Sequence, residues 1–160
     1  MYDTKIDLSE EVRTKVAKYL NERLADAIDL GAQTKHAHWN VKGPNFIALH
    51  ELFDKVAENV EDHIDELAER VTQLGGTAYG TLAAAARATS LRPYPEDITE
   101  GVAHVEALSA SLADFGKKVR KGIATTGDWG DADTADLLTG ISRDVDKYLW
   151  FLEAHLQAKR

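Results

Sequence analysis

Apolar residues recur at helical spacing along four long stretches of the chain, and this periodicity constrains the fold more than any other feature of the sequence. The segments between them are rich in glycine, proline and acidic residues, which end or cap helices. The sequence contains no internal repeat and no alternation of Val, Ile and Thr typical of a strand. The pattern therefore predicts an all-α fold with four long helices.

The first two expected helices are joined by the short turn "NVKGPN". The first runs from about residue 10 to 38, with Ser9 suited to cap it and two glutamates in its first turn. Asn45 is suited to cap the second helix, which ends at Gly75 and Gly76. Such a short connection predicts an antiparallel pair.

The last two expected helices form a second pair. The third begins near Ile98, after two prolines, and the fourth follows acidic caps around Asp131 and Asp133. Roughly 20 residues separate the second helix from the third, a length typical of the single long crossover in ferritin-like four-helix bundles. Within this crossover, "TLAAAARAT" predicts a short extra helix.

Length and composition favour one domain over residues 1–160, with residues 1–8 as a short N-terminal tail without a basic cluster. No apolar run reaches the about 18 residues that span a membrane, and the start "MYDTKIDLSEE" resembles no leader, so we expect a cytoplasmic protein. The chain has no cysteine, so any metal must be held by imidazole and carboxylate. The formal charge of -8 favours cations as ligands.

Three histidines cluster in "KHAHWNVKGPNFIALHELFD". His36 and His38 diverge by roughly 200° on a helix, so only one can face a given site. His38 lies near the apolar stripe, where a lone histidine is usually a packing residue, and so needs other ligands beside it. The second helix supplies them, because His50 and Asp54 stand at the i,i+4 spacing that lets two side chains reach one ion.

A second pair, Asp65 and Glu69, repeats this spacing further along the same helix. The eleven residues from Asp54 to Asp65 correspond to about 16 Å of helical rise, so the two pairs cannot share an ion within one chain. If two copies of the helix pack antiparallel about a two-fold axis, Asp65 and Glu69 of one copy face His50 and Asp54 of the other. Such a contact generates two equivalent sites per dimer.

Two imidazoles and three carboxylates suit Fe(II) or Mn(II), with Zn(II) as a possible substitute. The alternative is that these acidic side chains form a solvated helix face, a reading that is strongest for Glu58 and Glu61. The Glu-x-x-His motifs of intrachain di-iron bundles do not occur in the sequence.

The chain resembles the Dps family, the DNA-protection-during-starvation miniferritins, through "HWNVKGPNFIALHELFD", "IDELAERVTQLGG" and "DTADLLTGISRDVDKYLWFLE". The resemblance runs from about residue 10 to 157. It implies a hollow homododecamer that oxidises Fe(II) at two-fold interfaces, preferably with hydrogen peroxide. The cage would store the ferric mineral and so protect DNA from hydroxyl radical. The positions that match the family's ferroxidase ligands are His38, His50 and Asp54 of one subunit with Asp65 and Glu69 of its neighbour.

Three aromatic residues have weaker assignments. The resemblance implies that Trp39 lies near the metal centre and absorbs stray oxidising equivalents, while packing in the turn between the first two helices explains it equally well. Tyr148 and Trp150 lie on the fourth stripe and are expected in the core.

Four aspartates surround the start of the fourth helix. Capping explains Asp131 or Asp133 without any further role. Because three-fold pores in the Dps family are acidic, the resemblance also implies that some of these carboxylates draw Fe(II) inward. The four are Asp128, Asp131, Asp133 and Asp136. The remaining histidines are expected at the surface or in packing, and they are His63, His104 and His155.

The competing hypothesis is a nucleoid-associated protein that binds and shields DNA physically. Members of the Dps family that condense DNA commonly use lysine-rich tails, whereas here Lys5 stands between Asp3 and Asp7, and the C-terminus offers only Lys159 and Arg160. Twelve copies carry a formal charge of -96, twelve times -8, which opposes a polyanion. We expect weak or absent DNA binding near neutral pH. A zinc or manganese buffer without a mineral core is a further alternative.

Overall fold

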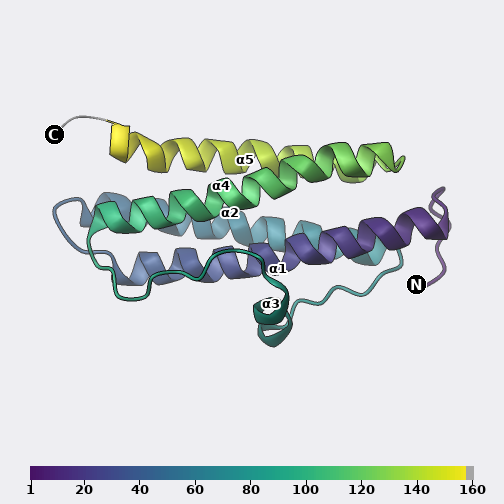
Figure 1. Ribbon diagram of the computed structural model, residues 1–160, viewed down its shortest axis with the longest axis horizontal. Helices are drawn as coiled ribbons and strands as arrows, with labels where there is room; N and C mark the ends of the chain where they lie inside the picture. Colours follow the sequence, from purple (N-terminus) through teal and green to yellow (C-terminus); the bar gives the residue numbers. More distant parts are fainter. Residues whose placement is uncertain (158–160) are drawn as a thin grey trace.

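The computed structural model describes residues 1–157 as a bundle of four long helices with a fifth, short helix on one side (Figure 1). Within these residues the only β-type pairing is an isolated bridge between Lys42 and Glu100. The prediction of an all-α fold with a short extra helix is confirmed. The helices are α1 (Glu10–Asn40), α2 (Phe46–Gln73), α3 (Leu82–Ala88), α4 (Gly101–Asp128) and α5 (Ala132–Gln157).

The four long helices form two antiparallel hairpins, α1 with α2 and α4 with α5, as the short connections predict. The crossover, residues 74–100, carries α3 and runs back along the bundle to the end where α1 turns into α2 (Figure 1). There the Lys42 amide donates a 2.8 Å hydrogen bond to the Thr99 carbonyl. Consequently α4 starts beside the α1–α2 turn and runs parallel to α2.

One predicted cap and one predicted helix start differ in the structure. Ser9 caps α1 by accepting a hydrogen bond from the Val12 amide, but the Asn45 side chain makes no capping bond at the start of α2. Helix α4 begins at Gly101, so Ile98 precedes it and the crossover is longer than predicted. The hydrogen bond from the Lys42 amide to the Thr99 carbonyl holds this segment extended.

The crossover is fixed to α1 by the buried carboxylate of Asp26. This carboxylate accepts hydrogen bonds from the Ser90 amide at 2.7 Å and from Arg23 Nε at 3.1 Å. Thr89 adds a 2.7 Å bond to Asp29. The buried charges of Asp26 and Arg23 are therefore paired with each other, which is the condition under which burial of a charge is tolerated.

The N-terminal tail lies against the far end of α2. The Tyr2 amide donates to the Gly75 carbonyl at 2.7 Å. The Arg13 guanidinium donates to the carbonyls of Leu74 at 2.9 Å, Tyr2 at 3.3 Å and Leu8 at 3.3 Å. Residues 1–8 thus follow the surface of the bundle.

The core lies between the two hairpins and consists mainly of leucine, valine and two phenylalanines, Phe53 and Phe115. Tyr148 packs partly buried against it, as expected. The prediction for Trp150 is wrong, because its side chain is 61% exposed. On α5 it stands two residues from the buried Leu152, roughly 200° around the helix, and so faces away from the core.

A buried ion pair joins the α4–α5 turn to α2. Asp131 is 2% exposed and accepts a 2.9 Å hydrogen bond from Arg70 Nη2. It also accepts from the Thr134 amide at 2.9 Å and the Thr134 hydroxyl at 2.6 Å, and so caps α5.

Replacing Asp131 by alanine should lower the free energy of unfolding by about 3–5 kcal/mol, because the buried Arg70 charge loses its partner. The matched control is Asp136→Ala, which removes an exposed carboxylate on the same helix and should change stability by less than about 0.5 kcal/mol. Urea denaturation of the two variants measures the difference, and equal effects would contradict this role for the ion pair.

Candidate metal centre

His38 and His50 bring α1 and α2 together at the closed end of the hairpin. Their imidazole rings stack with centroids 3.7 Å apart and an interplanar angle of 21°. Nδ1 of His38 lies 2.8 Å from the His50 carbonyl oxygen, and Nδ1 of His50 lies 2.8 Å from the His38 carbonyl oxygen. The two residues therefore hold each other in a reciprocal pair of hydrogen bonds.

This pairing fixes which ring nitrogen is free. A carbonyl oxygen accepts hydrogen bonds only, so Nδ1 of both His38 and His50 must carry the proton. In the neutral imidazole, Nε2 then keeps its lone pair. A backbone carbonyl in this position is the usual orienting partner of a metal-binding histidine. Both rings are thus prepared to bind a metal ion through Nε2.

Asp54 adds a carboxylate next to these rings. Its Oδ1 lies 3.8 Å from Nδ1 of His38 and accepts a 2.7 Å hydrogen bond from Lys35 Nζ. This bond from Lys35 is the main reason that the pKa of the Asp54 carboxyl lies below its ordinary value, against the opposing effect of desolvation. Sequence reasoning missed Lys35, although its position three residues before His38 places it on the same side of α1.

The second predicted pair of ligands lies elsewhere in the same chain. Asp65 and Glu69 are exposed on α2, separated from Asp54 by about 16 Å of helical rise. Within residues 1–157, no cluster of three or more histidine, aspartate or glutamate side chains is arranged to hold an ion. The structure stacks His38 on His50 and places Asp54 3.8 Å from His38, without arranging the three to hold an ion within one chain, and Asp65 and Glu69 lie apart from them.

A shallow groove of about 630 Å³ runs along the outer face of α1 and α2, and of the predicted ligands Asp54 lines it. Trp39 borders it and is 69% exposed, so the expectation that Trp39 packs in the α1–α2 turn is wrong. Lys35 Nζ lies 5.8 Å from the centre of its ring. The groove combines apolar and acidic side chains, including Ile28, Lys35, Trp39, Asp54, Glu58, Glu61 and Ile64.

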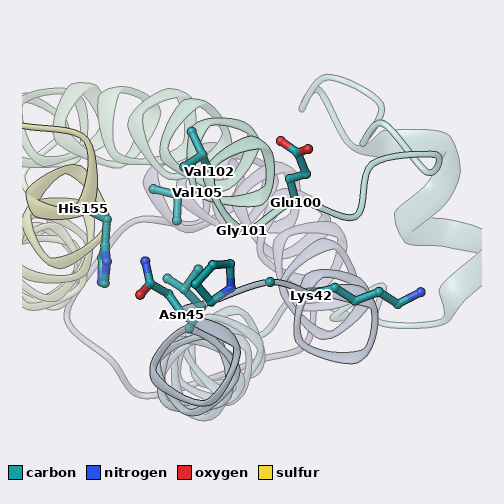
Figure 2. Close-up of a pocket in the computed structure, with 10 residues that line it drawn as sticks. Lys42, Asn45, Glu100, Gly101, Val102, Val105 and His155 are labelled. Carbon is teal, nitrogen blue, oxygen red and sulfur yellow. The ribbon is translucent and has the colours of Figure 1, made fainter. Parts of the chain in front are cut away.

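A second pocket, of about 560 Å³, opens at the same end of the bundle (Figure 2). His155 of α5 points into it, and Asn45, Val102 and Val105 line its walls. None of the predicted ligands lines this pocket, and its surface is mainly apolar. It is therefore separate from the metal centre.

The predicted pore aspartates fall into two groups. Asp131 is buried and both of its carboxylate oxygens accept hydrogen bonds, so its role is to stabilise the fold. Asp128, Asp133 and Asp136 are exposed around the α4–α5 turn. Of the remaining histidines, His63 and His104 are buried in packing, whereas His155 is exposed.

Comparison with known proteins shows the family to which the chain belongs. A model of the ferritin-like domain family, Ferritin, matches residues 17–160. The DNA protection during starvation protein of Agrobacterium fabrum is 48% identical over 158 residues, which cover 99% of this chain and 98% of the relative. The chain belongs to the Dps family.

Solved Dps structures have the same fold. Mycobacterium smegmatis Dps matches with a TM-score of 0.93 and 34% identity, over 99% of this chain and 96% of the other. A Dps protein of Vibrio cholerae matches with a TM-score of 0.91 and 27% identity, over 98% of each chain. That protein is described as a member of a broad superfamily of ferritin-like diiron-carboxylate proteins. Within residues 1–157 of this Dps-family chain, no helix has the length and apolar character needed to cross a membrane.

Replacing Lys35 by glutamine should raise the pKa of Asp54 toward its ordinary value, because the main cause of its depression is removed. At a fixed acidic pH, the ionised fraction of Asp54 should therefore fall. Carbon-13 NMR of the side-chain carboxyl groups measures this titration. Lys55→Gln, which removes an exposed lysine one residue after Asp54, is the control. An Asp54 titration that is the same in both variants would contradict the assigned role of Lys35.

Proposed function

We propose that this Dps-family protein is a ferroxidase that oxidises Fe(II) at sites between subunits and stores the ferric product in a protein cage. The observation that carries the proposal is the reciprocal pair of hydrogen bonds between His38 and His50. It leaves the two Nε2 atoms as the metal-binding nitrogens, with Asp54 next to His38 and also lining the groove along α1 and α2. This is half of a metal site, open on the side where a second copy would complete it.

The other half comes from the neighbouring subunit in this proposal. Asp65 and Glu69 are exposed and lie one i,i+4 step apart on α2. An antiparallel two-fold pairing of α2 places them opposite His50 and Asp54 of the partner and generates two identical sites. The groove along α1 and α2 supplies apolar surface for such a contact.

The reaction balances with peroxide as the oxidant. Two Fe(II) ions and one hydrogen peroxide, with two protons, give two Fe(III) ions and two waters. Two imidazoles and three carboxylates form a donor set suited to Fe(II), with Mn(II) or Zn(II) as substitutes. The protein orients the ions and offsets their charge, while iron and peroxide carry the redox chemistry. Paired oxidation avoids the one-electron step that releases hydroxyl radical.

The storage cage is the homododecamer implied by family membership, and its charge fits a cation as cargo. Each chain carries a formal charge of -8, which raises the local concentration of Fe(II). Asp128, Asp133 and Asp136 are exposed around one turn and are our candidates for residues at an entry pore.

Replacing His50 by alanine or Asp65 by asparagine should reduce the rate of Fe(II) oxidation to near that of protein-free iron, because each change removes a ligand. Stopped-flow absorbance with equimolar peroxide measures the rate, and circular dichroism tests whether the helices remain folded. Asp62→Asn, which removes an exposed carboxylate next to the ligand stripe, should retain the rate. Full activity in both ligand variants would refute the site.

Mixed assemblies of these two variants test whether ligands come from two chains. In a dimer of one His50→Ala subunit and one Asp65→Asn subunit, one site carries both defects and the other carries neither. The intersubunit model therefore predicts that activity returns on mixing the dissociated subunits and reassembling them. If all ligands came from one chain, every site would keep a defect and no activity would return.

A nucleoid-associated protein that shields DNA is the second candidate function, and the family's descriptive name favours it. Two observations weigh against direct DNA binding. The net charge of the chain is negative. Residues 1–8 are held against the bundle by hydrogen bonds of the Tyr2 backbone with Arg13 and Gly75. A basic tail that is free to reach phosphates is not found among the described residues 1–157.

We expect no gel shift of duplex DNA near neutral pH at about 0.15 M salt without divalent metal, because acidic proteins gain no counterion release from phosphates. The control is the same chain with a lysine-rich peptide fused at its N-terminus, which should shift the same DNA. A clear shift by the unmodified protein would overturn this expectation and favour the nucleoid function.

A further inference from the structure

Three buried imidazole nitrogens outside the candidate metal centre lack a hydrogen-bond partner within residues 1–157, Nε2 of His36, His63 and His104, and two of them, those of His36 and His104, lie in one cluster. The ring of Tyr94 lies against both histidines, with centroids 5.4 Å from His36 and 6.1 Å from His104. These side chains come from α1, the crossover and α4, and we call them the Tyr94 cluster. The proposed ferroxidase chemistry uses none of them.

The Tyr94 hydroxyl lies 2.7 Å from Nδ1 of His104. Burial lowers the pKa of His104 and the neighbouring His36 lowers it further, while the Ile98 carbonyl acts in the opposite direction. Burial also raises the pKa of the Tyr94 phenol. Near neutral pH the phenol is therefore protonated and the imidazole neutral, so Tyr94 donates and His104 accepts.

This arrangement makes Tyr94 easier to oxidise than an ordinary tyrosine. A phenol that loses an electron becomes strongly acidic, and a neutral imidazole at hydrogen-bond distance can take its proton in the same step. Tyr19 offers a contrast, because its hydroxyl donates at 2.6 Å to the Lys118 carbonyl, which accepts no proton. Among the tyrosine hydroxyl groups that form hydrogen bonds within residues 1–157, that of Tyr94 has a basic nitrogen as its partner.

One aromatic contact extends from the Tyr94 cluster toward the segment of α2 that carries a candidate ligand. The ring of Phe53, which precedes the ligand Asp54, lies 6.4 Å from the ring of His104. His36 stands three residues before Trp39 on α1, so these two side chains are neighbours on the helix surface. Phe53 and Trp39 thus stand next in sequence to the candidate ligands Asp54 and His38, and the ring of Phe53 also reaches the Tyr94 cluster.

We propose that Tyr94 and His104 form a one-electron redox pair that removes oxidising equivalents escaping the paired oxidation of iron. The source of the oxidant rests on the proposed function. A single Fe(II) that meets hydrogen peroxide gives Fe(III), hydroxide and hydroxyl radical. The radical takes one electron through the protein and one proton from solvent, and becomes water. Tyr94 supplies the electron and becomes a neutral phenoxyl radical as its proton moves to His104 Nδ1.

A small one-electron reductant of the ascorbate class completes the cycle. It returns one electron to Tyr94 and becomes its own one-electron-oxidised radical, while His104 returns the proton to the phenol. Tyr94 is accessible to such a molecule, because it lines two surface pockets together with Pro93. The pair is thereby restored after each event.

The first experiment needs no iron. Azide radicals generated by pulse radiolysis oxidise tryptophans of the metal-free protein, and visible absorbance follows transfer of the oxidation to tyrosine. The unaltered protein should show an intramolecular phase that is lost in Tyr94→Phe and kept in Tyr19→Phe. His104→Gln should slow it, because an amide accepts no proton. An unchanged phase in Tyr94→Phe would overturn the proposal, whatever the protein does with iron.

The second experiment supplies Fe(II) and peroxide. Freeze-quench electron paramagnetic resonance should detect a tyrosyl radical in the unaltered protein and in Tyr19→Phe but not in Tyr94→Phe, with the rate of iron oxidation the same in all three. A tyrosyl signal of equal size in Tyr94→Phe would overturn the assignment. If the unaltered protein does not accelerate iron oxidation, the ferroxidase proposal fails, while the azide experiment still decides the redox pair.

Discussion

The rigid rise of α2 is the constraint on which the proposed metal chemistry of this chain depends. A straight helix keeps Asp54 and Asp65 about 16 Å apart however its side chains rotate. In the proposed function the two i,i+4 pairs are therefore two half-sites, and a second helix running in the opposite direction is needed to complete either one. In the proposed ferroxidase the surface that joins subunits also carries the ligands, so assembly and catalysis would depend on the same residues.

The sequence predicted the architecture well because each long helix carries its own apolar stripe and boundary signals. Ser9 and the acidic caps gave correct helix starts from local chemistry alone. Errors arose where distant contacts decide the conformation. The start of α4 depends on the Lys42–Thr99 hydrogen bond, which joins residues far apart in sequence. Trp150 was assigned to the apolar stripe of the last helix, although its position around α5 directs its side chain away from the core.

The candidate site was predictable in residue type and spacing, but its internal geometry was not. Side-chain spacing placed His38, His50 and Asp54 close together, as the structure has them. No sequence pattern shows that each histidine bonds the other's backbone, or that Lys35 reaches across from α1 to Asp54. These contacts depend on the relative rotation of α1 and α2, which is set by packing along the whole hairpin.

The reciprocal bonds of His38 and His50 also bear on how such a site can change over evolutionary time. Many metal-binding histidines are oriented by a carboxylate side chain, so a mutation of that second residue disturbs the ligand. Here the acceptors are main-chain carbonyls, which every amino acid provides whatever its side chain. The orientation of each imidazole is thus insulated from substitutions at neighbouring positions, provided the hairpin keeps its shape. Surrounding residues can therefore diverge while the imidazole rings of the two proposed ligands keep their orientation.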